Sequence, residues 1–163
     1  MQITTTIDIN APASAAWVIF GDRFAEISEW SDAITKSSID RDLGEGAIRT
    51  CDVKAFGPVP AGQFTEELTH FDPASRSLTY VVLSGTPGFM RYVDNAWTFE
   101  GLGDDRCRIT SIATFEFVWW MVPMTPLMRM SMSRSVRKFT EQLGEHVEGT
   151  HRGPSSAAAP QTT

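Results

Sequence analysis

A single glutamate, Glu66, is the strongest candidate for chemistry in this chain. Phe64 shares its side of a predicted strand, whereas Glu67 points to the other side. A carboxylate among apolar side chains loses hydration, so we expect the pKa of Glu66 to be raised. The group would then act as an acid, a base or a hydrogen-bond donor to a ligand. Two alternatives remain: a register slip that places Glu67 inside, or a structural ion pair with Arg49 or Arg91.

The predicted strand that follows the glycine-rich turn at residues 85–88 offers two further polar groups. Its alternation places Val93 on the inner face, and Arg91 and Asn95 share that parity. A buried asparagine amide needs hydrogen-bond partners, which are either a ligand oxygen or a neighbouring backbone group at a bulge. Arg91 is expected at the mouth of a cavity. Glu66, Asn95 and Arg91 are therefore the predicted catalytic residues.

Histidine and cysteine are too sparse to predict a metal site. His70 shares the inward parity but stands near the end of its predicted strand, so it either relays a proton or lies in water at the turn. His146 and His151 are five residues apart, which is poor geometry on a helix. Cys51 and Cys107 lie in separate strands and are expected to be reduced, buried thiols. Without a Gly-x-Ser-x-Gly elbow, a Walker loop or a dinucleotide fingerprint, we expect no external cofactor.

Apolar side chains on the predicted inner faces would form the walls of a cavity. Ser111 and Ala113 are small residues of one strand face and would leave room beneath a covering helix. The first half of the last predicted helix uses methionine in place of leucine, and methionine adapts to irregular cavities. The predicted ligand-binding residues are Trp30, Phe64, His70, Val93, Trp97, Ser111, Phe115, Met128 and Met132. The alternative is that these side chains fill an ordinary core.

Length and charge restrict the classes of protein. The 163 residues are enough for one domain with a core, which we expect over residues 1–150, followed by a disordered tail at residues 151–163. A net charge of −6 argues against a nucleic-acid partner. The longest apolar stretch, residues 117–124, is too short to span a bilayer, so no membrane insertion is expected. We find no signal-peptide pattern and expect a cytoplasmic location.

The periodicity of apolar residues predicts the order of the elements. A first strand at residues 2–10 is followed by short helices at residues 13–20 and 24–30. Further strands are expected at residues 34–40, 47–56, 63–71, 76–84, 89–99 and 106–118, with glycine and proline turns between them. Regular spacing of this kind is typical of an antiparallel meander.

The last predicted helix is the element around which this sheet is organised. Met128, Met132 and Val136 begin an apolar stripe at helical spacing that continues to residue 147. From residue 124 to 147 the helix would be about 36 Å long, enough to lie across a sheet. The sequence thus predicts an α+β fold in which a curved antiparallel sheet of about seven strands wraps around one long C-terminal helix.

Short motifs keep a fixed order along the chain. They are Ile9-Asn-Ala-Pro-Ala-Ser-Ala-Ala-Trp17, Phe24…Trp30…Ile34, Gly44-x-Gly46-x-x-Arg49, Glu66-Glu-Leu68 with Phe71-Asp72, Leu78-Thr-Tyr80, and Trp97 before the final helix. Their order resembles the START-like, helix-grip superfamily, which includes the polyketide cyclase/dehydrase and lipid-transport family, birch-pollen-allergen-like proteins and plant hormone receptors. The resemblance implies a cavity between the sheet and the helices. It also implies a glutamate of the ligand pocket at the position of Glu66.

Three functions follow from this resemblance. The first is a cyclase or dehydrase that folds a hydrophobic, oxygenated small molecule in its cavity, where Glu66 moves a proton while Asn95 and Arg91 hold an oxygen. The second is a non-catalytic carrier or sensor of a lipid or terpenoid-like ligand. The third is an interaction module, like the co-chaperone relatives of this fold, in which the cavity is incidental. The chain is expected to be a monomer or a homodimer.

Overall fold

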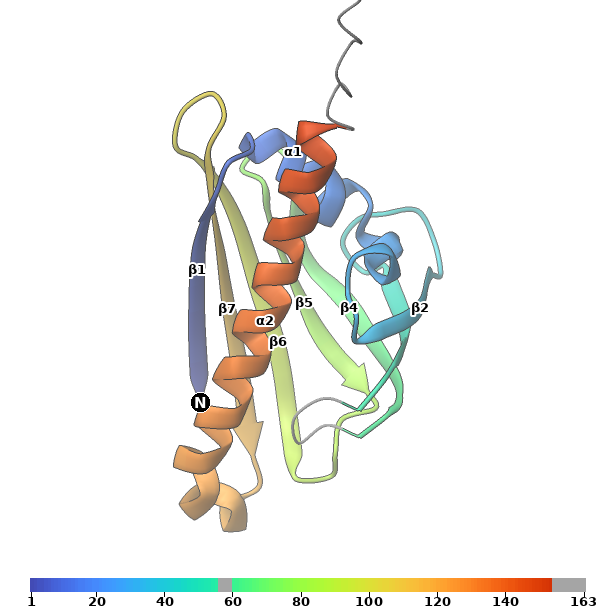
Figure 1. Cartoon of the computed structure of the whole chain (residues 1–163). Helices are drawn as coiled ribbons and strands as arrows, with labels where there is room; N and C mark the ends of the chain where they lie inside the picture. The colour runs from blue at the N-terminus through green and yellow to red at the C-terminus, as the bar shows by residue number, and fades with distance from the viewer. Residues whose placement is uncertain (56–59, 154–163) are drawn as a thin grey trace, which may run out of the picture.

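The computed structural model describes residues 1–55 and 60–153. After strand β1 (Gln2–Ile9) come the short helices α1 (Ala13–Trp17), η1 (Val18–Asp22) and η2 (Phe24–Glu29). Strands β2 (Ile34–Ile39), β3 (Ile48–Val53), β4 (Gly62–Asp72), β5 (Ser77–Ser84), β6 (Met90–Gly101) and β7 (Cys107–Phe117) follow. A short helix, η3 (Trp119–Met124), leads into the long helix α2 (Thr125–Arg152) (Figure 1).

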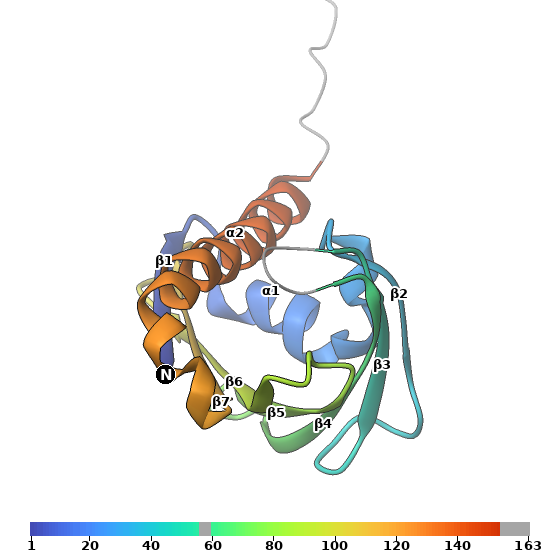
Figure 2. The same ribbon diagram turned by 90° about the horizontal axis from the view of Figure 1, so that it is seen from below.

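The strands of the described part of the chain form one seven-stranded sheet in the order β1-β7-β6-β5-β4-β3-β2. All six pairings are antiparallel. Strands β2 to β7 are neighbours in sequence and in space, which confirms the predicted meander, and β1 adds to its β7 edge. The sheet curls around α2 and the short helices (Figure 2). This arrangement confirms the predicted helix-grip fold.

Bulges in β4 and β6 change which side chains face the interior. The register of β4 with β5 shifts between Leu68 and His70. The register of β6 with β7 shifts between Met90 and Tyr92. Because side chains alternate along a strand, one extra residue moves the side chains beyond it to the opposite face. The alternation in the sequence therefore gives the wrong face near one end of each of these strands.

Two apolar clusters fill much of the interior. The larger one joins the short helices, the sheet and the C-terminal half of α2; in it the fully buried Trp97 lies 4.4 Å from Phe20 and 6.0 Å from Phe139, measured between ring centroids. The smaller one gathers Met90 and Met132 with neighbouring residues of β1, β7 and α2. The region where the two clusters meet contains the cavity described below.

Helix α2 lies close against β1 at Gly144. A Cβ atom at this position would lie 2.8 Å from Cδ1 of Ile7 and 3.0 Å from Cγ2 of Ile9. Glycine is a poor helix former and costs about 1 kcal/mol relative to alanine. The close approach to β1 gives this helical glycine a packing reason, because a larger residue would force the side chains of Ile7 and Ile9 to shift.

The ends of the elements differ from the sequence prediction in a few places. Helix α2 ends at Arg152 rather than near residue 147, so the first two residues of the predicted tail are helical. The remaining tail from residue 154, and the predicted end of the third strand at residue 56, lie outside the described residues. The two predicted short helices form as an α-helical turn, a π-helical turn and a 3-10 helix. Within the described residues, no helix is both long and apolar enough to cross a bilayer.

Candidate functional site

A cavity of about 530 Å³ lies between the inner face of the sheet and helix α2. Its walls are mainly apolar and come from both clusters. They include Ile27, Ile34, Val53, Phe64, Val82, Met90, Val93, Ala113, Phe115, Met132, Val136 and Phe139. Small-molecule sites occupy about 300–1,000 Å³. The interior is therefore not packed solid and has room for a ligand of ordinary metabolite size.

An ion pair between Arg49 and Glu66 stands on this apolar wall. The two residues are directly opposite each other on β3 and β4. Nε and Nη2 of Arg49 donate to Oε2 of Glu66 at 2.8 and 2.6 Å. Arg49 also donates from Nη1 to the backbone oxygen of Phe24 at 2.8 Å, and its Cζ lies 3.7 Å from the centre of the Phe24 ring. The side chain of Arg49 is 1 % exposed and that of Glu66 13 % exposed.

The protonation of the groups around this pair follows from burial and charge. Burial is the largest single influence on Arg49 and works against its charge. The charge and hydrogen bonds of Glu66, together with the neighbouring Cys51 and Tyr80, outweigh burial, so the pKa of the guanidinium is raised. Burial also raises the pKa of the Cys51 thiol to about 11, and burial together with the charge of Glu66 raises the pKa of the Tyr80 phenol. The thiol and the phenol therefore keep their protons at neutral pH and can donate hydrogen bonds.

A second polar group of side chains lies beside Tyr80. Ser111 donates from Oγ to Oδ1 of Asn95 at 2.9 Å, and Asn95 donates from Nδ2 to the phenol oxygen of Tyr80 at 3.5 Å. Asn95 and Tyr80 line the cavity, whereas Ser111 is fully buried behind them. The partners of Asn95 are therefore side chains, not the backbone of a bulge, and its amide borders the space that a ligand would fill.

Comparison with protein families matches residues 1–148 to the model described as "Polyketide cyclase / dehydrase and lipid transport". The chain belongs to this family. The match covers the whole sheet and nearly all of α2, so it confirms the resemblance found in the sequence motifs. A comparison with curated protein sequences finds no match.

Solved structures show the same fold in other members of the superfamily. The Zhui aromatase/cyclase from Streptomyces sp. R1128 is 18 % identical with a TM-score of 0.74, covering 98 % of this chain and 99 % of that one. Norcoclaurine synthase from Thalictrum flavum, solved with dopamine and hydroxybenzaldehyde, is 15 % identical with a TM-score of 0.68, covering 90 % and 86 %. The di-domain aromatase/cyclase BexL of the BE-7585A biosynthetic pathway is 14 % identical with a TM-score of 0.77, covering 91 % and 46 %. At these identities the likeness concerns the fold alone.

Six of the predicted site residues line the cavity of this polyketide cyclase/dehydrase family member. They are Glu66, Asn95, Phe64, Val93, Phe115 and Met132. Trp30, Trp97, Ser111 and Met128 are buried but do not contribute to its lining. Trp97 and Trp30 pack on other aromatic rings of the core instead, at 4.4 and 5.8 Å from the ring of Phe20. Both tryptophans therefore stand behind the lining of the cavity, and their contact with a ligand stays a prediction.

The bulges turn Arg91 and His70 outward, against the inward parity that the alternation indicated. For His70 this agrees with the expected alternative of a residue in water at the turn. Arg91 is the extra residue of the β6 bulge and is exposed, while Met90 takes the inward position. His70 follows the β4 bulge and is also exposed, with Nδ1 3.5 Å from Oε1 of Glu45. Phe71 packs against the core in its place. Neither Arg91 nor His70 lines the cavity.

Glu66 is not surrounded by apolar side chains alone, because Arg49 lies against it. This is the ion pair that the sequence offered as an alternative. Tyr80 was not among the predicted site residues. One signal was available: Arg49 and Cys51 share a parity in β3, and a cysteine on the inner face implies an arginine there as well. Both cysteines are buried and unbridged in the described part of the chain, as predicted. No three His, Cys, Asp or Glu side chains within residues 1–55 and 60–153 group as metal ligands would.

Proposed function

We propose that this protein binds a hydrophobic, oxygenated small molecule in its cavity and catalyses a ring-forming or dehydration step by acid–base chemistry. The observation that carries the proposal is the Arg49–Glu66 ion pair on an otherwise apolar wall. Replacing a buried ion pair by apolar residues of similar volume is often neutral or stabilising, so folding alone does not require one. The pair is better explained by a substrate that carries oxygen.

The two oxygens of Glu66 suit different roles. Oε2 accepts both hydrogen bonds from Arg49, whereas Oε1 accepts none from the described residues. In the proposed step, a proton leaves a substrate carbon next to a carbonyl and moves to Oε1. The electron pair of the broken C–H bond forms the new C–C bond to a second carbonyl carbon of the same substrate. Glu66 then returns the proton to the resulting alkoxide. For a dehydration, Glu66 removes a second proton from the same substrate carbon, the electron pair of that C–H bond forms a C=C bond, and the C–O bond breaks as the hydroxyl takes up the proton and leaves as water.

The donors around Glu66 would stabilise the negative charge that develops on oxygen. Arg49 is held charged beside the cavity, and the phenol of Tyr80 keeps its proton. Donors that are already in place when the charge develops lower the barrier without reorganisation. Arg49 thus takes the role that the sequence prediction gave to Arg91. The amide of Asn95, which contacts Tyr80, would help to orient the same oxygen.

The apolar walls would contribute by shaping the substrate. A flexible chain that must close a ring loses conformational entropy before reaction, and binding in a fitted cavity supplies that ordering in advance. Phe64 and Phe115 provide flat walls, and Met132 provides an adaptable one. Water exclusion by these residues would also strengthen the electrostatic effect of the ion pair.

The second candidate function is a carrier that only binds its ligand. One observation favours it: the polar side chains of the cavity bond one another, Arg49 to Glu66 and Ser111 to Asn95 to Tyr80. Such closed groups can anchor a ligand oxygen without any proton transfer. The family description, which names lipid transport beside cyclase and dehydrase activity, supports this candidate equally.

The test begins with native mass spectrometry of the purified protein, which identifies the co-purifying small molecule. Turnover and affinity are then measured for wild type and for Glu66→Gln, with Glu67→Gln as the matched control, because Glu67 does not line the cavity. For an enzyme we expect Glu66→Gln to lose about 100-fold in turnover while affinity changes only a few-fold. For a carrier, affinity falls and no product forms with any variant. A wild-type protein that binds no small molecule would overturn both candidates.

A further inference from the structure

Large apolar side chains stand in solvent at the junction of β7, η3 and α2. Trp119 is 82 % exposed and Trp120 is 56 % exposed, and the short helix η3 buries none of its residues. We call the exposed residues Trp119, Trp120, Val122, Met124, Leu127 and Met130 the tryptophan patch. Water is an unfavourable surrounding for apolar side chains of this size, so burying them against a partner would be favourable. A contiguous exposed group of this kind indicates an interaction surface.

A basic surface continues directly from the patch along α2. Leu127, Met130, Arg134 and Arg137 follow each other at steps of three and four residues, which places them on one helix face, and all four are exposed. At the rise of an α-helix, Arg134 stands about 6 Å and Arg137 about 10 Å beyond Met130. The face thus changes from apolar to basic within two helical turns.

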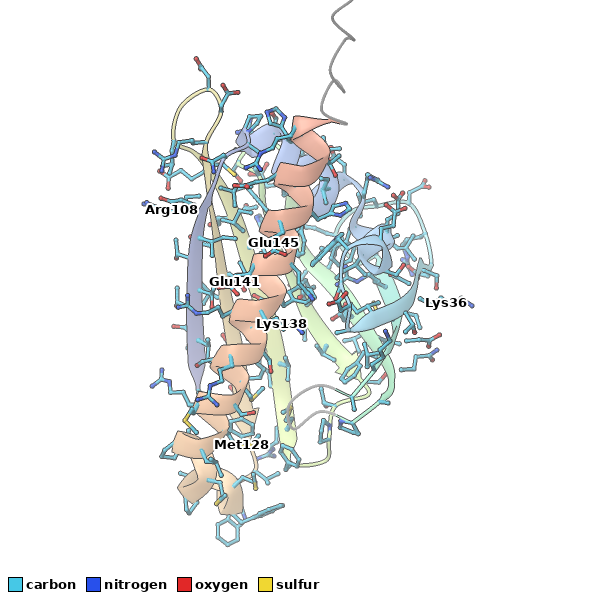
Figure 3. All side chains as sticks on the ribbon, viewed as in Figure 1. Lys36, Arg108, Met128, Lys138, Glu141 and Glu145 are labelled. Carbon is cyan, nitrogen blue, oxygen red and sulfur yellow. The ribbon has the colours of Figure 1, made fainter. Side chains whose placement is uncertain are left out.

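The charges of the whole chain make this segment distinctive. Residues 117–140 contain four basic side chains, Arg129, Arg134, Arg137 and Lys138, and no acidic one. All 20 acidic residues of the chain lie elsewhere, together with only 10 of its 14 basic residues. The basic segment ends where Glu141 and Glu145 begin, farther along α2 (Figure 3). A positive end on an acidic protein favours a partner with negative charge.

We propose that the tryptophan patch docks on the surface of a bilayer that contains anionic lipids. Tryptophan suits the membrane–water interface because its ring is apolar and its N–H is polar. Interfacial helices bury their apolar face about 5–10 Å into the headgroup region, which would bring Arg134 and Arg137 to the lipid phosphates. Each such arginine strengthens binding to an anionic surface about fivefold. Docking is shallow and involves no spanning segment, and it revises the sequence expectation that no residue enters a membrane.

A second copy of the chain fits the same surface less well. A two-fold interface brings a surface against an identical one, so the positive charge that flanks the patch would meet no complementary negative patch on the partner. Arg137 lies 3.9 Å from Oε1 of Glu141 at the end of this surface, whereas residues 117–140 themselves contain no acidic side chain. Phospholipids supply both complements of this surface: their acyl chains form an apolar layer and their headgroup phosphates carry negative charge.

The tryptophan patch lies beside one end of the cavity wall. If the proposed function holds, docking would therefore place the ligand cavity next to the membrane. The N–H of Val118, directly before η3, donates to the backbone oxygen of Phe89 at 3.0 Å, so η3 is joined to the start of β6 (Figure 2). Met90, the next residue of β6, lines the cavity and packs in the same apolar cluster as Met121 of η3. Docking would bring this end of the cavity wall to a membrane in which apolar ligands collect.

The tryptophans themselves provide the assay. The chain has five, and Trp17, Trp30 and Trp97 are already buried, so a change of emission on adding vesicles reports Trp119 and Trp120. With phosphatidylcholine vesicles that contain about 30 % phosphatidylserine, we expect co-sedimentation, a blue shift and quenching by brominated lipid. Binding is expected to weaken at high salt and to be at least tenfold weaker without phosphatidylserine.

Variants separate the two parts of the surface. Trp119→Ser combined with Trp120→Ser is expected to lose at least tenfold in vesicle binding, and Arg134→Gln with Arg137→Gln to lose the preference for phosphatidylserine. Val18→Ser is the control, because Val18 is 46 % exposed and follows α1 at the opposite end of α2 from η3 (Figure 1). It should bind vesicles as wild type does.

Two results would overturn the proposal. One is wild-type vesicle binding by the double tryptophan variant. The other is a stable dimer in ultracentrifugation without lipid, in which the emission of Trp119 and Trp120 is already blue-shifted. The vesicles carry no ligand, so this assay does not depend on the proposed function. Failure of Glu66→Gln to alter turnover or ligand affinity, with vesicle binding intact, would remove the proposed function and leave the docking surface in place.

Discussion

Arg49 gives two hydrogen bonds to one oxygen of Glu66, from Nε at 2.8 Å and from Nη2 at 2.6 Å. The two residues are cross-strand partners on β3 and β4, so the backbone register itself brings them together. Each charge depends on the other, because an unpaired charge at this depth would be costly. In the proposed reaction, in contrast, the two groups have different roles: Glu66 moves a proton, and Arg49 stabilises negative charge on oxygen.

This dependence predicts strong coupling between the two residues in stability. Arg49→Met leaves the carboxylate without its partner and is expected to lower the free energy of unfolding by about 3 kcal/mol. Glu66→Gln leaves a buried guanidinium and should have a similar effect. The double variant should lose clearly less than the sum, as urea unfolding of all four proteins will show. Additive losses would mean that Arg49 and Glu66 do not stabilise each other in the folded protein, in contradiction to their geometry.

The buried thiols predict a loss of stability at alkaline pH. Burial raises the pKa of Cys51 and of Cys107 to about 11 from the ordinary 9.0. Above pH 9.0 the unfolded chain therefore loses thiol protons that the folded chain keeps, so stability is complete below this pH and falls as the pH rises towards about 11. Urea midpoints across this window should fall less steeply for Cys51→Ala than for wild type. Equal slopes would show that Cys51 titrates normally in the folded protein.

The close approach of α2 to β1 predicts opposite effects at two helical glycines. Gly144→Leu inserts a side chain where Ile7 and Ile9 leave no space, and we expect a loss of about 1–3 kcal/mol in unfolding free energy. Gly149→Leu meets no atom within 4 Å and should gain up to about 1 kcal/mol from helix propensity. Thermal unfolding followed by circular dichroism tests both. A gain at both positions would contradict the packing of α2 on β1.

The phenol of Tyr80 is expected to recognise ligand oxygen. Tyr80→Phe removes one donor and keeps the shape of the cavity, so affinity for 1-naphthaldehyde should fall about five-fold while affinity for 1-methylnaphthalene stays the same. Displacement of a fluorescent dye such as anilinonaphthalene sulfonate measures both ligands. Equal changes for the two ligands would assign Tyr80 to the wall of the cavity and not to its polar site.

Much of the fold was predictable from the sequence because it depends on local periodicity. Alternating apolar residues determined the strands, the apolar stripe from Met128 onward determined α2, and the order of motifs determined the family. The inward positions of Glu66 and Asn95 followed from the same alternation, which holds across the middle of β4 and β6. These properties need only the sequence, because a strand or helix turns its side chains at a fixed angle per residue.

The tertiary structure alone decided the composition of the site. Bulges turned Arg91 and His70 outward, and a bulge depends on how two strands pair, which neither strand shows by itself. The pairing of β3 with β4 chose Arg49 as the partner of Glu66. The volume of the cavity and the exposure of Trp119 are likewise set by how closely the sheet, η3 and α2 meet. Distances between elements far apart in the chain arise only when the whole sheet has curled around the helix.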